Sequence, residues 1–148
     1  MSPTSNGAST RKLRRRLLLP AVAVVLVFLA VTLIALEGKE VVVLGTQDAD
    51  RTRRATRTWI AAEDGSLWIE AANPERPFLM DIATRPDVEL RHGNATQKCR
   101  AYIELNPQGH LRIRRLLAAK YGWADSWVGL LTDTSGSLAV RLQCEQSE

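Results

Sequence analysis

Residues 17–36 read LLLPAVAVVLVFLAVTLIAL, a run of twenty positions without a charged side chain. A helix rises about 1.5 Å per residue, so this block is about 30 Å long and matches the hydrocarbon core of a bilayer. A core helix of a soluble protein keeps a polar face toward water, and this block has none. We therefore predict one transmembrane helix over residues 17–36, followed by a single domain, residues 37–148, at the membrane surface.

The charges on the two sides of this block predict its orientation. Residues 1–16 contain five Lys and Arg residues and no acid, whereas Glu37, Lys39 and Glu40 follow the block. The positive-inside rule predicts a basic cytoplasmic tail at residues 1–16 and an extracytoplasmic domain. A cleaved secretory signal is the alternative. We favour an uncleaved single-pass anchor because the block is long for a signal and no clear A-x-A site follows it.

The basic tail also explains the formal net charge of +4. The first 36 residues hold five of the 20 basic residues and none of the 16 acidic ones, so the domain retains 15 bases and 16 acids, a net of −1. A basic face for binding DNA or RNA is therefore not expected. The partner that this charge distribution predicts is the lipid bilayer.

The domain has mainly β character, with short apolar runs and alternating segments separated by turn residues. Proline-started segments predict two helices, one over residues 77–83 and one from Asn106-Pro107 to Gly122, continued by an amphipathic turn over residues 125–131. We predict an α+β, mainly β fold: a small six-stranded barrel covered by two helices. The six expected strands are residues 41–46, 57–63, 67–72, 88–91, 98–105 and 137–144.

The chain has two cysteines, Cys99 and Cys144, which are too few for a disulfide scaffold. Both lie in expected strands, so they could pair if those strands are neighbours. A free cysteine is commonly a small core residue, and we therefore expect two buried, reduced thiols.

No nucleophile triad, metal cluster or phosphate loop is recognisable in the sequence. His92 and His110 have no cysteine or acid at ligand spacing, so we predict no metal site and no catalytic side chain. The aromatic residues are ambiguous. For Trp59 and Trp68 we expect packing on adjacent strands, with a wall for a planar ligand as the alternative. For Trp123 and Trp127 we expect core packing, with lipid headgroups as the alternative. These last two are spaced i, i+4, as on one helical face.

The densest charge outside the tail is the group Arg51, Arg53, Arg54 and Arg57. Guanidinium groups suit a phosphate because their donors form a planar fork. Runs of charge usually mark solvated faces, so composition alone favours a hairpin tip in water.

Three stretches together resemble the split β-barrel flavin and deazaflavin oxidoreductases, in particular the deazaflavin-dependent nitroreductase-like family. They are VVVLGTQDADRTRRATRTWI at residues 41–60, RPFLMDIATRPDVEL at residues 76–90, and KYGWADSWVGLL followed by SLAVRL at residues 120–142. The resemblance implies a homodimer of split barrels with a flavin-type cofactor, FMN or the deazaflavin F420, at the subunit boundary.

The same resemblance implies which residues bind the cofactor. The basic turn and the next strand would hold its phosphate, and the end of the third strand with the loop after it would border its ring. By position, the phosphate residues are Arg51, Arg54, Arg57 and Thr58, and the ring residues are Ala71, Ala72 and Asn73.

Taken together, these features predict a membrane-anchored flavin- or deazaflavin-dependent oxidoreductase that transfers hydride to a small lipophilic acceptor, quinone-like or nitroaromatic. The alternative is a non-catalytic, membrane-tethered split barrel that binds a ligand or another protein. The acids Asp48 and Asp50, next to the expected phosphate, and the exported topology favour this alternative.

Overall fold

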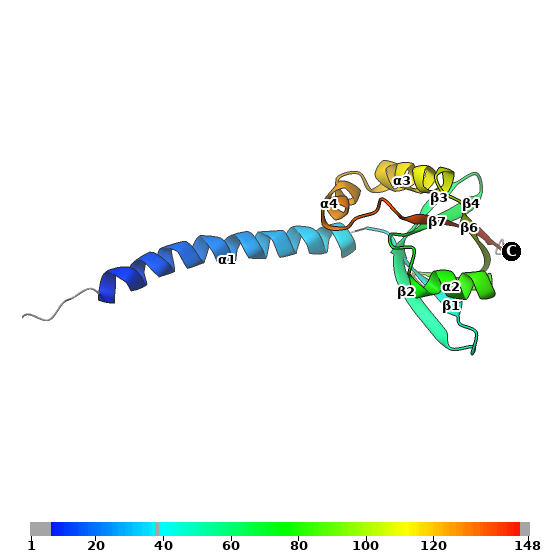
Figure 1. Cartoon of the computed structure of the whole chain (residues 1–148), viewed down its shortest axis with the longest axis horizontal. Helices are drawn as coiled ribbons and strands as arrows, with labels where there is room; N and C mark the ends of the chain where they lie inside the picture. The colour runs from blue at the N-terminus through cyan, green and yellow to red at the C-terminus, as the bar shows by residue number, and fades with distance from the viewer. Residues whose placement is uncertain (1–6, 38, 146–148) are drawn as a thin grey trace, which may run out of the picture.

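A helix of 31 residues, α1 (Gly7–Glu37), leads into a domain of strands with helices around it (Figure 1). The computed structural model describes the backbone of residues 7–37 and 39–145, and the side chains of residues 19–36 and 39–145. The stretch Leu19–Leu36 of α1 is long and apolar enough to cross a membrane, in line with the prediction for residues 17–36. Residues 1–6 of the expected tail lie outside the described residues.

The described part of the domain has seven strands and three helices. Their order is β1 (Val41–Gln47), β2 (Arg53–Trp59), β3 (Ala61–Glu63), β4 (Ser66–Ala71), α2 (Pro77–Thr84), β5 (Asp87–His92), β6 (Ala95–Glu104), α3 (Gln108–Tyr121), α4 (Trp123–Leu131) and β7 (Leu138–Cys144).

The strands form one antiparallel sheet in the order β2-β1-β5-β6-β7-β4-β3. β2 and β3 lie at opposite edges of this order, yet only Ile60 separates them in the chain. The sheet must therefore curl until its two edges meet at Ile60. The result is a barrel that is open along the seam between β2 and β4, since these two strands are not paired with each other.

The predicted strand over residues 57–63 is wrong in one respect, because the chain changes partners within it. Trp59 pairs with Val41 of β1, whereas Ala61 pairs with Trp68 of β4. Between them, the Ile60 N–H donates to the Tyr121 hydroxyl (3.1 Å) and is not part of a strand ladder. The barrel therefore has seven strands where the sequence predicted six.

Alternation along the strands builds the barrel interior. On β1, Val42 and Leu44 are fully buried and alternate with half-buried neighbours. Ile69, Val140 and Leu142 join them from the strands on the other side of the sheet. A second apolar cluster lies under α3, built from Ala61, Trp68, Ile113, Leu117, Tyr121 and Ala139.

The covering helices mostly follow the prediction. α2 begins with Pro77 and ends at Thr84, just before Pro86, and α3 ends at Tyr121. The segment expected as a turn that continues α3 is instead a separate helix, α4. Gly122 has a positive φ of 54°, which glycine adopts readily and which breaks the helix, so α4 leaves in a new direction. In Figure 1, α4 lies against the end of α1.

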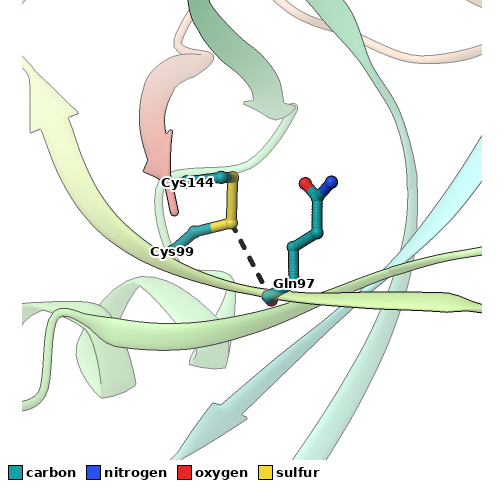
Figure 2. Close-up of a disulfide and its surroundings, with 3 residues drawn as sticks. All are labelled: Gln97, Cys99 and Cys144. Atoms are coloured by element: carbon teal, nitrogen blue, oxygen red, sulfur yellow. Dashed lines mark hydrogen bonds between the residues drawn. A yellow bond between two sulfur atoms is a disulfide. The ribbon is translucent and has the colours of Figure 1, made fainter. Parts of the chain in front are cut away.

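The expectation of two reduced thiols is wrong, because Cys99 and Cys144 form a disulfide (Figure 2). β6 and β7 are neighbours, and their register places Cys99 directly opposite Cys144, with the two Cα atoms 3.9 Å apart. A separation of 45 residues hides this pairing in the sequence, since the strand register depends on long-range contacts.

Candidate functional site

A groove of about 330 Å³ lies at the open seam of the barrel. Pockets for small molecules usually have volumes of a few hundred cubic ångströms and mostly apolar walls with a few polar groups. This groove, called the seam groove below, has that composition. It is lined by Leu36, Val41, Thr56, Arg57, Thr58, Trp59, Glu70, Ala72, Arg76, Phe78, Leu117 and Val128.

The seam groove contains three of the residues that the family resemblance picked out. Arg57 and Thr58 come from β2, and Ala72 follows β4 on the other side of the seam. Arg76, directly before the proline that starts α2, adds a second exposed guanidinium group. The fold brings these residues together, because β2 and β4 are the strands that border the seam.

Arg54 has a different partner. Its Nε donates to Oδ2 of Asp81 at 3.1 Å, and the Thr46 hydroxyl donates to the same oxygen at 2.6 Å. Asp81 is 4% exposed on α2, so its charge needs these partners. Arg54 therefore links α2 to the β1–β2 hairpin.

The remaining predicted residues lie away from the seam groove. Arg51 is exposed at the tip of the β1–β2 hairpin, where it has a positive φ of 65°. Ala71 is buried in the barrel core. Asn73 is exposed, and its side-chain oxygen accepts a hydrogen bond from the Glu75 N–H (2.8 Å) in the turn before α2.

A nearly buried charge cluster adjoins the seam groove through Glu70, which belongs to both. Arg114 of α3 donates to Glu70 Oε2 at 3.0 Å and to Asp125 Oδ2 of α4 at 2.7 Å. The other carboxylate oxygen, Glu70 Oε1, is buried and has no hydrogen-bond partner among the described residues. Glu70 lines the seam groove, but this oxygen is shielded from it, so the carboxylate depends on its pair with Arg114.

Tyr121 closes the end of the seam nearest to α1. Its hydroxyl donates to the carbonyl of Ile60 (2.8 Å) or of Glu40 (2.9 Å), and its ring stacks on Trp59 at 4.6 Å between centroids. Burial is the main cause that raises the pKa of Tyr121 above its ordinary value of 10.0. The phenol therefore stays protonated at neutral pH and acts as a structural hydrogen-bonding group.

A larger and more polar hollow, of about 820 Å³, lies on the outer face of the sheet, since its residues Val43 and Gly45 alternate with the buried Val42 and Leu44. Bases and acids are mixed along it: Arg53, Arg54, Arg91, Lys98 and Arg100 with Asp87, Glu89 and Glu145. The described residues contain no group of three or more His, Cys, Asp or Glu side chains that could hold a metal ion.

Sequence reasoning missed Arg76, Phe78 and Glu70 as site residues. Arg76 and Phe78 surround Pro77 at the start of α2, and only their position across the seam from β2 makes them part of the groove. Glu70 alternates outward on a predicted strand, and nothing in its local sequence distinguishes it from a surface acid.

No protein-family model matches the chain, and no curated protein matches it. Several solved structures do share its architecture. A candidate pyridoxamine 5'-phosphate oxidase from Listeria innocua is 18% identical with a TM-score of 0.52, over 77% of this chain and 90% of that one.

Two further structures agree. The heme-storage protein HutZ from Vibrio cholerae is 14% identical with a TM-score of 0.53, over 76% of this chain and 87% of that one. An F420 reductase is 18% identical with a TM-score of 0.52, over 72% of this chain and 87% of that one. The fold is a split barrel. At these identities the likeness shows the fold alone, and the split-barrel architecture that the sequence predicted is confirmed.

Proposed function

We propose that this chain is a membrane-anchored split-barrel oxidoreductase that binds FMN or F420 in the seam groove and delivers hydride to a lipophilic acceptor. One observation carries the proposal. The groove combines apolar walls with the guanidinium groups of Arg57 and Arg76, and it reaches Leu36 at the end of the predicted membrane span.

The side chains around the groove fit a cofactor of this kind. Arg57 and Arg76 supply planar forks of donors that suit a phosphate. Trp59, which is half-buried, supplies aromatic surface for a ring system. When bound, the cofactor would supply the hydride chemistry, and these residues bind it, orient it and exclude water.

Two features support the anchored, extracytoplasmic placement. α1 packs on the domain through Ala35, which is fully buried, and through Thr32, which accepts a hydrogen bond from Trp127 Nε1 (3.2 Å). A cleaved signal would leave these contacts unmade. The Cys99–Cys144 disulfide is typical of oxidising compartments outside the cytoplasm. This agrees with the predicted orientation, in which the N-terminus is cytoplasmic and the domain is not.

Titration of the full-length protein in nanodiscs tests the proposal. We expect FMN or F420 to bind with a dissociation constant below tens of micromolar. Binding is measured from the change in cofactor absorbance. Arg57→Ala and Arg76→Ala should each weaken binding by about 10- to 100-fold, since a charged hydrogen bond contributes about 1.5–3 kcal/mol. Arg53→Ala is the matched control, because Arg53 is exposed on the same strand but lies outside the groove. Absence of binding, or equal losses in all three variants, contradicts the proposal.

The second candidate is the non-catalytic tethered module. The Arg54–Asp81 ion pair and the acids Asp48 and Asp50 favour it, because they lower the positive potential of the hairpin that was expected to hold a phosphate. On this hypothesis neither cofactor binds to the wild type or to Arg57→Ala.

We also propose a homodimer, as the family resemblance implies. The outer hollow of the sheet places both signs of charge side by side, which suits a self-complementary contact. Native mass spectrometry from nanodiscs should give the mass of two chains, and a single-chain mass contradicts the dimer.

A further inference from the structure

We propose that α4 is a membrane-interface helix, which lies beside the end of α1 with its apolar face in the lipid of the outer leaflet. This inference rests on the membrane anchoring proposed above. It assigns the bilayer as the partner of a surface on the barrel domain itself, beyond the span.

The depth of α4 follows from its contacts with α1. Trp127 bonds to Thr32, and its ring lies 5.4 Å from that of Phe28 between centroids. Thr32 and Phe28 precede Leu36, the end of the span, by four and eight residues, which corresponds to about 6 and 12 Å along a helix. A span that crosses the bilayer therefore carries Trp127 into the lipid with it.

The apolar and acidic side chains of α4 lie on different sides of the helix, as this placement requires. Trp123, Leu130 and Leu131 are 52%, 80% and 50% exposed, which is unusual for such large apolar side chains in one short helix. The acid of the helix, Asp125, is buried against Arg114 on the barrel side. Polar contacts thus hold α4 to the barrel, and the apolar side chains remain for lipid.

The residues at the edge of this surface fit the headgroup region. Lys39, just after the span, places its ammonium 5.7 Å from the centre of the Trp123 ring. Tryptophan with a neighbouring lysine is typical of the boundary between hydrocarbon and headgroups. Val128 of the same helix lines the seam groove, so the groove opens next to the lipid and a membrane-dissolved molecule can enter it directly.

Quenching by brominated lipids tests this inference. The full-length protein is reconstituted in phosphatidylcholine nanodiscs with bromine at mid-chain. We expect about half of the tryptophan emission to be quenched, because two of the four tryptophans lie on α4. The Trp123→Phe/Trp127→Phe double variant should lose most of this quenching, whereas Trp68→Phe, which removes a buried barrel tryptophan, should retain it. Equal quenched fractions in wild type and double variant overturn the inference.

A second pair of variants tests the lipid contact without removing a tryptophan. Leu130→Glu should reduce quenching and shift the Trp emission to longer wavelength, because a carboxylate is costly in lipid. Leu105→Glu, at an 82% exposed position after β6, should change neither. The same change in both variants overturns the inference.

Extraction with alkaline carbonate separates this inference from the anchoring. Protein that stays in the membrane but shows no α4 quenching overturns the interface helix alone. Protein that is released from the membrane overturns the anchor and the interface helix together.

Discussion

The two helices that cover the barrel openings, α2 and α3, are held in different ways. α2 buries Phe78, Leu79 and Ile82 in the main core, and its Asp81 is paired with Arg54. α3 also buries three large apolar side chains, Ile113, Leu117 and Tyr121, but it is flanked in addition by ion pairs from Arg112, Arg114, Arg115 and Lys120.

This difference follows the position of each helix relative to α1. Lys120 pairs with Glu40 (2.5 Å) and donates to the Ile60 carbonyl (2.7 Å), so α3 ties the barrel to the segment that directly follows α1. Polar contacts suit that place because the neighbouring backbone at Ile60 and Glu40 lies outside strand pairing. α2 covers the core away from α1, and apolar burial is sufficient there.

The largest expected effect is in the apolar helix. Phe78→Ala should lower the free energy of unfolding by about 3–5 kcal/mol, because it removes a side chain that is only 2% exposed and leaves a cavity. Denaturant titration in detergent micelles measures the change. Met80→Ala on the same helix, 73% exposed, should cost about 0.5 kcal/mol or less. Similar losses in both variants would show that α2 is not held by burial.

The next effect concerns the charge cluster under α3. Arg114→Ala should cost about 2–4 kcal/mol, because it leaves Glu70 and Asp125 nearly buried without their counter-charge. Arg115→Ala is the control, since its pair with Glu63 is exposed to water on the arginine side and contributes about 0–1 kcal/mol. Thermal unfolding of the two variants should separate clearly, and coincident curves contradict the prediction.

A smaller effect is expected from the hydroxyl that links α3 to the seam. Tyr121→Phe should cost about 1–3 kcal/mol, because the Ile60 N–H then loses its partner in a buried position. Denaturant titration at neutral pH checks this value, and an unchanged midpoint speaks against the role of the hydroxyl.

The same hydroxyl predicts a pH dependence. Below pH 10.0 the phenol is protonated in both the folded and the unfolded state, so its contribution is complete. Above that pH the unfolded chain releases the proton first, because burial raises the pKa of Tyr121 in the folded state. The free energy of unfolding should therefore fall as pH rises above 10.0, and less steeply in Tyr121→Phe. Parallel pH profiles for the two proteins would refute the assignment.

The smallest expected effect distinguishes Arg54 from Arg57, which lie on the same strand. Arg54→Ala should lower the free energy of unfolding by about 1 kcal/mol, since Arg54 is 42% exposed and its bond to Asp81 is partly screened. Its effect on cofactor affinity should be slight. Arg57→Ala should show the reverse order for affinity, with clearly weaker cofactor binding than in Arg54→Ala. Equal effects of both variants on affinity would place the phosphate nearer to the hairpin.

Much of the fold was predictable because its signals are local. Proline and glycine set the ends of α2 and α3, and the apolar run at residues 41–46 predicted a strand where the structure has β1. Three of the twelve groove residues, Arg57, Thr58 and Ala72, are among those that the family resemblance implied. Arg76 and Glu70 are not, because their membership in the site depends on which strands border the seam.

The sequence by itself determined the apolar helix, the mainly β domain and the ends of its covering helices, because each depends on residues a few positions apart. Only the tertiary structure decided that the chain changes sheet edges at Ile60, that Cys99 meets Cys144, and that Arg54 serves Asp81 while Arg57 lines the groove. These outcomes depend on strand order and register, which arise from contacts between distant segments and leave no local pattern in the chain.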